Sequence, residues 1–210
     1  MLLPLELTLE ILDLLQARGE TEVLLVCALV CREWYERCQD HLYETVRLRT
    51  RQQLYLLRRS LQKNALLRQL VYSLAVLNSA LGADALDLDI VFVVLASMLP
   101  NLRFLYCQTN DAFKSPGTLR VGPRALQYAS QIGLLHSLVL YYLHFETLAI
   151  FGRFIFAFPS LVTIVCTHVT ALSRGGERVV EGLMSRRLKL RMLIVSILPA
   201  VCSRDIRAVH

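Results

Sequence analysis

The chain has few charged residues and few glycines for its length of 210 residues. Asp, Glu, Lys and Arg make up 19% of the sequence and apolar residues 55%, which excludes a disordered protein, because disorder requires low hydrophobicity. The nine glycines are scattered and form no phosphate-binding loop or dinucleotide fingerprint. The G-x-S-x-G and H-E-x-x-H motifs are also missing. We therefore expect a protein that binds rather than catalyses.

The sequence shows no secretory signal and no disulfide framework. The N-terminus lacks the basic start of a signal peptide, and Glu6, Glu10 and Asp13 interrupt its first apolar run. Six cysteines occur without the spacing of a disulfide-rich domain. We therefore predict reduced thiols and a cytoplasmic or nuclear protein.

A zinc site is one interpretation of Cys27, Cys31 and Cys38 followed by His41, because residues four apart share a helix face. Two of these cysteines lie inside the apolar run at 23–31, however, where a small buried side chain is the simpler explanation. We therefore expect no metal and no cofactor.

Charge is distributed unevenly along the chain. Residues 1–44 contain nine acidic and three basic side chains, whereas residues 45–210 contain eight acidic and twenty basic ones. This asymmetry predicts two parts with different surroundings. The basic clusters at 47–68 and 186–191 leave a nucleic-acid-binding protein as an alternative. Because Tyr55 is the one aromatic residue within 47–68, we expect no nucleic-acid partner.

The first apolar stretch predicts a helix over 4–16 with two apolar sides. On a helical wheel its three carboxylates form one narrow polar stripe. One apolar face consists of Leu7, Ile11, Leu14 and Leu15, and the other of Leu5, Leu9 and Leu12. The run at 23–31 contains no polar side chain and is far too short to span a bilayer. We expect it to form a helix that is buried all round.

A basic connecting helix is predicted for 49–65, where Leu54, Leu57 and Leu61 recur at helical spacing. A loose repeat follows in 66–172, in which a leucine precedes a second aliphatic residue by three positions. The repeat begins at Leu67, Leu102, Leu135 and Leu161, and helix-like runs cover 86–98, 124–132 and 146–157. Asp84 is expected to cap the first of these helices. Helix, stop and short strand in repetition indicate an irregular α/β solenoid, with 173–210 as a tail or partial repeat.

One alternative is a membrane-associated protein that uses the apolar stretches within 125–173. Residues 154–173 are twenty residues without a formal charge, which is long enough to cross a bilayer. Pro159 in the middle, His168 and several hydroxyl side chains speak against a spanning helix. We therefore expect no membrane contact.

The N-terminal residues resemble the F-box, especially the version found in large fungal families of F-box proteins. The resemblance covers residues 1–48, "LPLELTLEILDLL" and "VLLVCALVCREWYERCQDHLYETVRL". The matching residues are Leu3, Pro4, Glu6, Leu7, Ile11, Leu15, Leu25, Val30, Cys31, Trp34, Leu42, Tyr43, Val46 and Leu48. The later segments "LPNLRFL" and "FPSLVTI" resemble the degenerate leucine-rich region that often follows an F-box.

This resemblance implies a three-helix F-box module at 1–48 followed by an irregular leucine-rich-repeat-like α/β solenoid. It also implies a non-catalytic receptor subunit of a cullin-based (SCF-type) ubiquitin ligase, which binds the small adaptor subunit through the F-box and an unknown target protein through the C-terminal region. One apolar face of the first helix would then pack inside the module and the other would await a partner helix. The residues expected on the adaptor face are Leu3, Pro4, Leu7, Ile11, Val30, Cys31 and Trp34. The alternative is that all of them are core residues of one larger helical domain.

Overall fold

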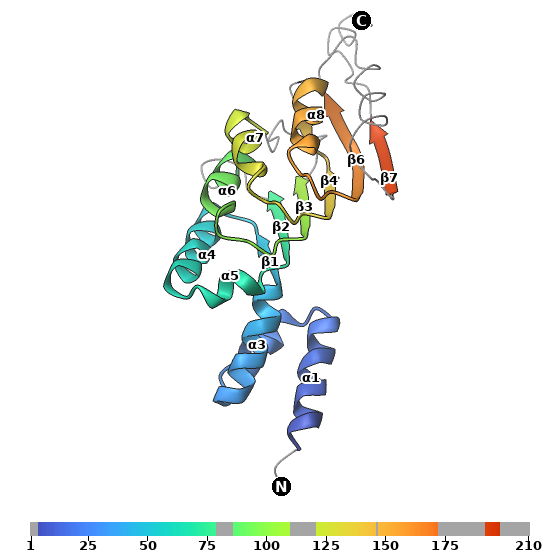
Figure 1. Ribbon diagram of the computed structural model, residues 1–210. Helices are drawn as coiled ribbons and strands as arrows, with labels where there is room; N and C mark the ends of the chain where they lie inside the picture. The colour runs from blue at the N-terminus through green and yellow to red at the C-terminus, as the bar shows by residue number, and fades with distance from the viewer. Residues whose placement is uncertain (1–3, 79–85, 110–120, 146, 172–191, 198–210) are drawn as a thin grey trace, which may run out of the picture.

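The structure, a computed structural model, describes residues 4–78, 86–109, 121–145, 147–171 and 192–197. It combines helices with strands, as the sequence predicts, and the strands form a parallel sheet (Figure 1). Three N-terminal helices stand at one end of the molecule, and the sheet with its covering helices forms the rest.

The N-terminal helices are α1 (Leu5–Ala17), α2 (Thr21–Cys27) and α3 (Arg32–Glu44). Helix α1 starts after Pro4, with Glu6 in its first turn, where the helix dipole favours a negative charge. It ends at a tight turn in which Gly19 adopts a φ of 75°, a conformation that glycine takes without steric cost. The three helices enclose a small core of Leu12, Leu24 and Cys38.

The expectation that the apolar run at 23–31 is buried all round is wrong. Helix α2 ends at Cys27, and only Leu24 of its seven residues is buried. A short helix in a small three-helix core can bury one stripe of side chains, so most of the other apolar side chains face outward, while Cys27 and Ala28 are half-buried against the core. The exposed residues of the run are Val23, Leu25, Val26, Leu29, Val30 and Cys31.

Seven strands form one sheet in which every pair among the described residues is parallel. The hydrogen-bonded order is β1-β2-β3-β4-β6-β5, and β7 also pairs with β6. Strands from β1 to β4 therefore lie side by side in chain order. The strands are β1 (Thr45–Leu48), β2 (Ser73–Asn78), β3 (Phe104–Thr109), β4 (Ser137–Tyr141), β5 (His144–Phe145), β6 (Thr163–Ala171) and β7 (Met192–Ile197).

The loose leucine repeat places equivalent residues at equivalent positions of the sheet. Leu102, Leu135 and Leu161 are buried, and each precedes the first inward-facing strand residue by three positions. Leu67 does not belong to this series, because it lies in helix α5 (Leu66–Leu70). Val71, which is buried and precedes Leu74 of β2 by three positions, takes that place. The first repeat is therefore four residues later than predicted.

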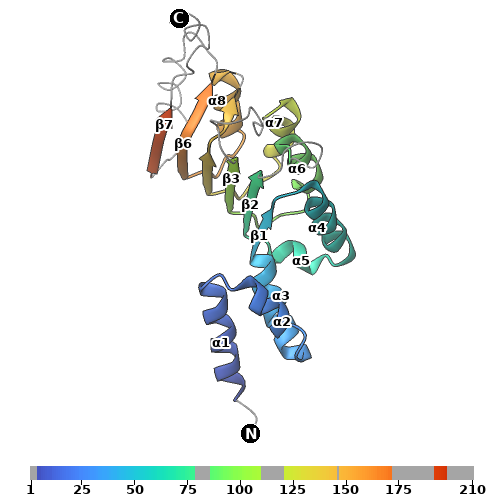
Figure 2. The same ribbon diagram turned by 180° about the vertical axis from the view of Figure 1, so that it is seen from behind.

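Helices cover one face of this sheet (Figures 1 and 2). Among the described residues these are α4 (Arg51–Lys63), α6 (Leu88–Leu95), α7 (Pro123–Ala129) and α8 (Leu148–Phe156). Their apolar sides and the inward strand residues form one continuous core. Phe92, Phe154 and Phe158 pack ring to ring within it, with centroid distances of 5.2–6.2 Å.

Helix α6 is capped by Asp87, whose carboxylate accepts a hydrogen bond from the backbone N–H of Asp89. The expectation that Asp84 caps this helix is therefore wrong, and Asp84 itself lies outside the described residues. The helix begins at Leu88, two residues later than predicted, and Leu86 is buried in the core ahead of it.

The stretch considered as a membrane span is divided in the structure. Its first residues end helix α8, and β6 follows after Pro159. Over the part of the chain that the structure describes, no helix reaches the length and apolarity needed to cross a bilayer.

Candidate functional site: the exposed face of the N-terminal helices

Helix α1 carries an apolar face that no described part of the chain covers. Leu7, Ile11 and Leu14 recur at the spacing that aligns side chains on one helix face, and their exposed fractions are 47%, 41% and 58%. Toward the small core, Leu12 is fully buried and Leu15 packs against it. The two apolar sides predicted for this helix are therefore distinct, with Leu15 on the inner one.

A second apolar surface follows from α2 into the turn before α3. Leu29 is 85% exposed and Val30 62% exposed, and both lie in the turn that joins these helices. This turn and the start of α1 both lie at the end of the molecule away from the sheet (Figure 1). Large exposed apolar side chains gathered in one region of a protein mark an interaction surface.

The structure shows where six of the seven predicted adaptor residues lie, while Leu3 falls outside the described residues. Leu7 and Ile11 share the exposed face of α1, and Pro4 is exposed just before it. Val30 and Cys31 are exposed at the α2–α3 turn. Trp34 differs from the others, because it is half-buried and packs against the core of Leu12, Leu24 and Cys38.

Leu14, Leu25, Val26 and Leu29 are more exposed than Leu7 and Ile11, but the predicted site did not include them. The helical spacing of Leu14 with Leu7 and Ile11 was a sufficient signal for the first. The others could be found only by recognising how little of the run at 23–31 a three-helix core can bury.

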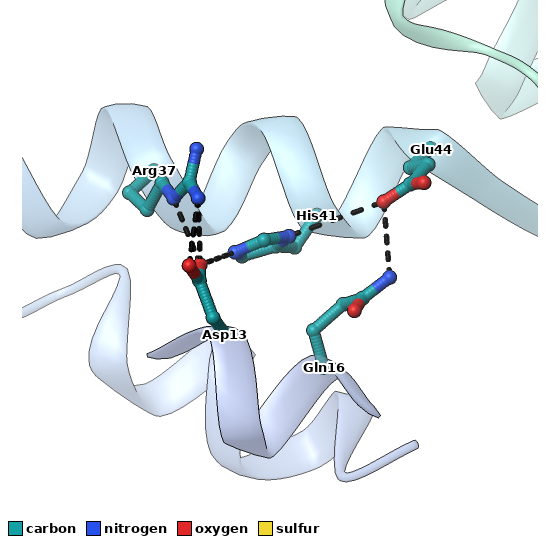
Figure 3. A network of polar contacts seen from close by, with 5 residues as sticks. All are labelled: Asp13, Gln16, Arg37, His41 and Glu44. Carbon is teal, nitrogen blue, oxygen red and sulfur yellow. Dashed lines mark hydrogen bonds and ion pairs between the residues drawn. The ribbon is translucent and has the colours of Figure 1, made fainter. Parts of the chain in front are cut away.

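A polar network holds α1 against α3 (Figure 3). Both Nε and Nη2 of Arg37 donate to Asp13 Oδ1, at 3.0 and 2.7 Å, and Nη2 also donates to Asp13 Oδ2 at 2.9 Å. Nε2 of His41 lies 2.7 Å from Asp13 Oδ1. One turn farther along, Gln16 Nε2 donates to Glu44 Oε2 at 2.9 Å. These contacts fix the orientation of α1 and therefore of its exposed face.

Two opposing effects act on the pKa of Asp13. Burial raises this pKa, but hydrogen bonds and charge attraction from Arg37 and His41 together outweigh burial and lower it. Asp13 was predicted only as part of a polar stripe. Its partners were visible in the sequence, since Arg37 and His41 are four residues apart and share a face of α3.

The described residues hold no group of three side chains placed to bind a metal ion. His41, which was considered as a zinc ligand with the nearby cysteines, instead contacts Asp13. Cys38 is buried in the small core, and burial raises the pKa of its thiol. Cys31 is exposed, so its expected burial within the apolar run is wrong.

Comparison with known proteins identifies the same part of the chain. The family model described as F-box-like matches residues 1–49, which confirms the resemblance at the N-terminus. The match includes all three helices and β1. Neither curated proteins nor solved structures gave a match to this chain.

Proposed function

We propose, from the F-box-like domain at residues 1–49, that this protein is the receptor subunit of a cullin-based ubiquitin ligase. In this function the domain binds the small adaptor subunit, and the sheet region binds a target protein. F-box proteins are generally non-catalytic receptors, so the ubiquitin chemistry would take place on other subunits. Cytoplasm and nucleus are the corresponding locations.

The observation that carries this proposal is the exposed apolar face of α1. Leu7, Ile11 and Leu14 remain in contact with solvent although the same helix buries Leu12 completely. A partner helix that covered this face would remove the three side chains from water, and each would gain about 1–2 kcal/mol because only part of its surface is exposed beforehand. The adaptor residues proposed here are Leu3, Pro4, Leu7, Ile11, Val30, Cys31 and Trp34.

Trp34 would have a mixed role within this surface. Its half-buried ring packs on the small core, so part of its contribution is to hold α3 in place rather than to contact the adaptor. Loss of binding in a Trp34 variant would therefore not distinguish contact from folding. Ile11 is the better test residue.

For the sheet region we propose a leucine-rich-repeat-like solenoid. Support comes from a backbone contact that recurs at the start of successive strands. The N–H groups of Arg103 and Phe104 both donate to the carbonyl of Tyr72, and those of His136 and Ser137 both donate to the carbonyl of Arg103. The N–H groups of Val162 and Thr163 donate in the same way to the carbonyl of His136. Successive units that stack by the same contact are typical of solenoids.

The test is capture of the cullin adaptor by the co-expressed chain. Ile11→Arg places a charge in the centre of the exposed face of α1, and we expect loss of capture, because a buried unpaired charge costs several kcal/mol. Leu66→Arg is the matched control, since Leu66 is 69% exposed on α5, outside the F-box-like domain. Circular dichroism verifies that both variants fold. A folded wild-type chain that captures no adaptor would refute the proposal.

A further inference from the structure

The sheet has a second face on which no described helix lies (Figures 1 and 2). Along β1 to β4 and β6 the buried residues alternate with residues that point to this free face. Leu105 and Cys107 of β3, for example, face the core, whereas Phe104 and Tyr106 point the other way. On β1 to β4 and β6, the free face therefore consists of the alternate residues of each strand.

The middle of this free face is aromatic. Phe104 is 51% exposed there, and the rings of Tyr106 and Tyr141 on the neighbouring strand lie 5.6 Å apart. The Tyr106 hydroxyl donates to Gln108 Oε1 at 2.6 Å, so this ring is held in position. A positioned aromatic group with an exposed Phe at its side is a typical anchor for a protein partner.

The β1 edge of the same face is basic. Arg47 is exposed on β1, and Arg49 is exposed directly after that strand. Arg47 pairs in register with Ala75 of β2, which pairs with Tyr106 of β3. Because neighbouring strands are about 4.8 Å apart, the backbones of Arg47 and Tyr106 are separated by roughly 10 Å, with the small side chain of Ala75 between them.

Acidic side chains are nearly missing from this part of the molecule. Among the described residues after Glu44, the acidic ones are Asp87 and Asp89, and both carboxylates cap helices on the covered side of the sheet. The outward positions of the described strands β1 to β4 and β6 therefore include Arg47 and aromatic rings but no carboxylate. Such a face attracts anionic groups and rejects cationic ones.

We propose that this face binds a protein segment that combines acidic residues with apolar or aromatic ones. The carboxylates would contact Arg47 and Arg49, and the apolar side chains would cover Phe104, Tyr106 and Tyr141. An acidic protein segment fits better than a nucleic acid, because Arg47 on the β1 edge is the one cation in the described strands β1 to β4 and β6, and their other outward positions are uncharged. We assign this segment to the ubiquitination target, and this assignment rests on the proposed function.

The test uses the full chain co-purified with the adaptor and three synthetic peptide pools of randomised order. The pools share the same content of Phe, Leu and Tyr and differ in one residue type, which is Glu, Ser or Lys. We expect the Glu pool to be retained roughly threefold to tenfold better than the Ser pool, the range that a few exposed ion pairs provide. The Lys pool should be retained least.

Two variants and one control locate the binding. Arg47→Glu combined with Arg49→Glu should abolish the preference for the Glu pool, and Phe104→Ser should lower the retention of the Glu and Ser pools alike. The matched control is Arg58→Glu combined with Arg59→Glu, because these exposed arginines lie on α4 on the other side of the sheet. This control should retain the preference for the Glu pool. Equal retention of the Glu and Ser pools, or a preference that survives the reversal at 47 and 49, would overturn the inference.

Two further outcomes would replace it. Retention of a single-stranded RNA oligonucleotide that is lost in the Arg47 and Arg49 variant would assign the face to nucleic acid. Self-association lost in the same variant would assign it to the acidic N-terminal helices of a second copy. Adaptor capture, measured in the same samples, tests the proposed function separately. Phe104 lies outside the F-box-like domain, and Arg47 and Arg49, which lie at its end, are on β1 and directly after it rather than on the exposed face of α1.

Discussion

At the scale of single residues, the contacts of Asp13 with Arg37 and His41 determine how α1 is oriented. Asp13 is the shared acceptor, so its charge holds two side chains of α3 at once. The ion pair is half-exposed, and an exposed pair contributes little through charge alone. The two parallel donors of Arg37 fix its guanidinium plane relative to the Asp13 carboxylate. The ion pair therefore fixes the orientation of α1 more than it adds to the stability of the fold.

This network predicts a dependence of stability on pH. The pKa of Asp13 is lowered from its ordinary value of 3.8 in the folded chain, so the ionised form stabilises the fold above that value. The contribution should be lost as the pH falls below about 4 and through the lowered pKa. We expect Asp13→Asn to lower the urea midpoint at neutral pH and the difference from wild type to shrink in acid. A difference that stays constant down to pH values below the lowered pKa would contradict this assignment.

Gly122 is a residue at which the addition of one methyl group should be costly. The Asp89 carboxylate accepts hydrogen bonds from the backbone N–H groups of Gly122 and Ala125, both at 2.9 Å, and thereby ties α6 to the start of α7. A Cβ on Gly122 would collide with the Asp89 carboxylate. We expect Gly122→Ala to reduce the free energy of unfolding by about 1–3 kcal/mol. Gly133→Ala is the control, because nothing lies within 4 Å of a Cβ there.

At the scale of helices and strands, the inward positions of the sheet form rows that cross the strands. Cys107 of β3 pairs in register with Leu140 of β4, which pairs with Cys166 of β6. All three side chains are buried. Cysteine serves here as a small apolar residue that fills the space between the sheet and its helices.

The same row predicts a pattern of thiol reactivity. Burial raises the pKa of Cys166 to about 12 and raises that of Cys107 as well, which leaves almost no thiolate at neutral pH. Cys31 is exposed at the α2–α3 turn. We expect iodoacetamide to modify Cys31 in the native chain, and Cys107 and Cys166 only in denaturant, as measured by mass spectrometry of the digested protein. Rapid modification of Cys107 in the native chain would mean that the helices do not shield this face of the sheet from solvent.

The elements differ in how far their sequences determine them. Helix α1 and the strands after Leu102 and Leu161 were predictable, because each combines a clear apolar period with a proline that marks a start or a stop. The strand after Leu135 followed from the repeat alone. The first repeat was misplaced at Leu67, since "LRQL" matches the spacing as well as "VYSL" does and only the sheet register distinguishes them. Burial of the run at 23–31 was not predictable from its composition, because exposure depends on how much core its neighbours provide.

At the scale of the whole molecule, two cores of very different size lie in one chain. The sheet and its helices share one large core, whereas the N-terminal helices enclose only Leu12, Leu24 and Cys38 with a few partly buried neighbours. Helix α3 continues directly into β1, and Tyr72 N–H donates to the Glu44 carbonyl at this junction. The small core is thus attached to a stable base but contributes little stability of its own.

This inequality predicts that the N-terminal helices open more easily than the sheet. Local stability follows the amount of buried apolar surface, so amide protons of α1 and α2 should exchange faster than those of β2, β3 and β4. An adaptor that covers the exposed face of α1 binds only the form of the chain in which the N-terminal helices are folded. At a free concentration of one hundred times its dissociation constant, it should therefore stabilise these helices by about 2.7 kcal/mol, which slows their exchange roughly a hundredfold.

Hydrogen exchange followed by mass spectrometry, with and without the adaptor, measures both effects in one experiment. Slowing confined to α1, α2 and the turn at Leu29 and Val30 would place the adaptor on the exposed apolar surface, while unchanged rates in β3 and β4 serve as the internal control. Equal protection of α1 and the sheet in the free chain would show that the small core is more stable than its size implies. In that case the open face of α1 would be a rigid, preformed docking surface rather than one that its partner completes.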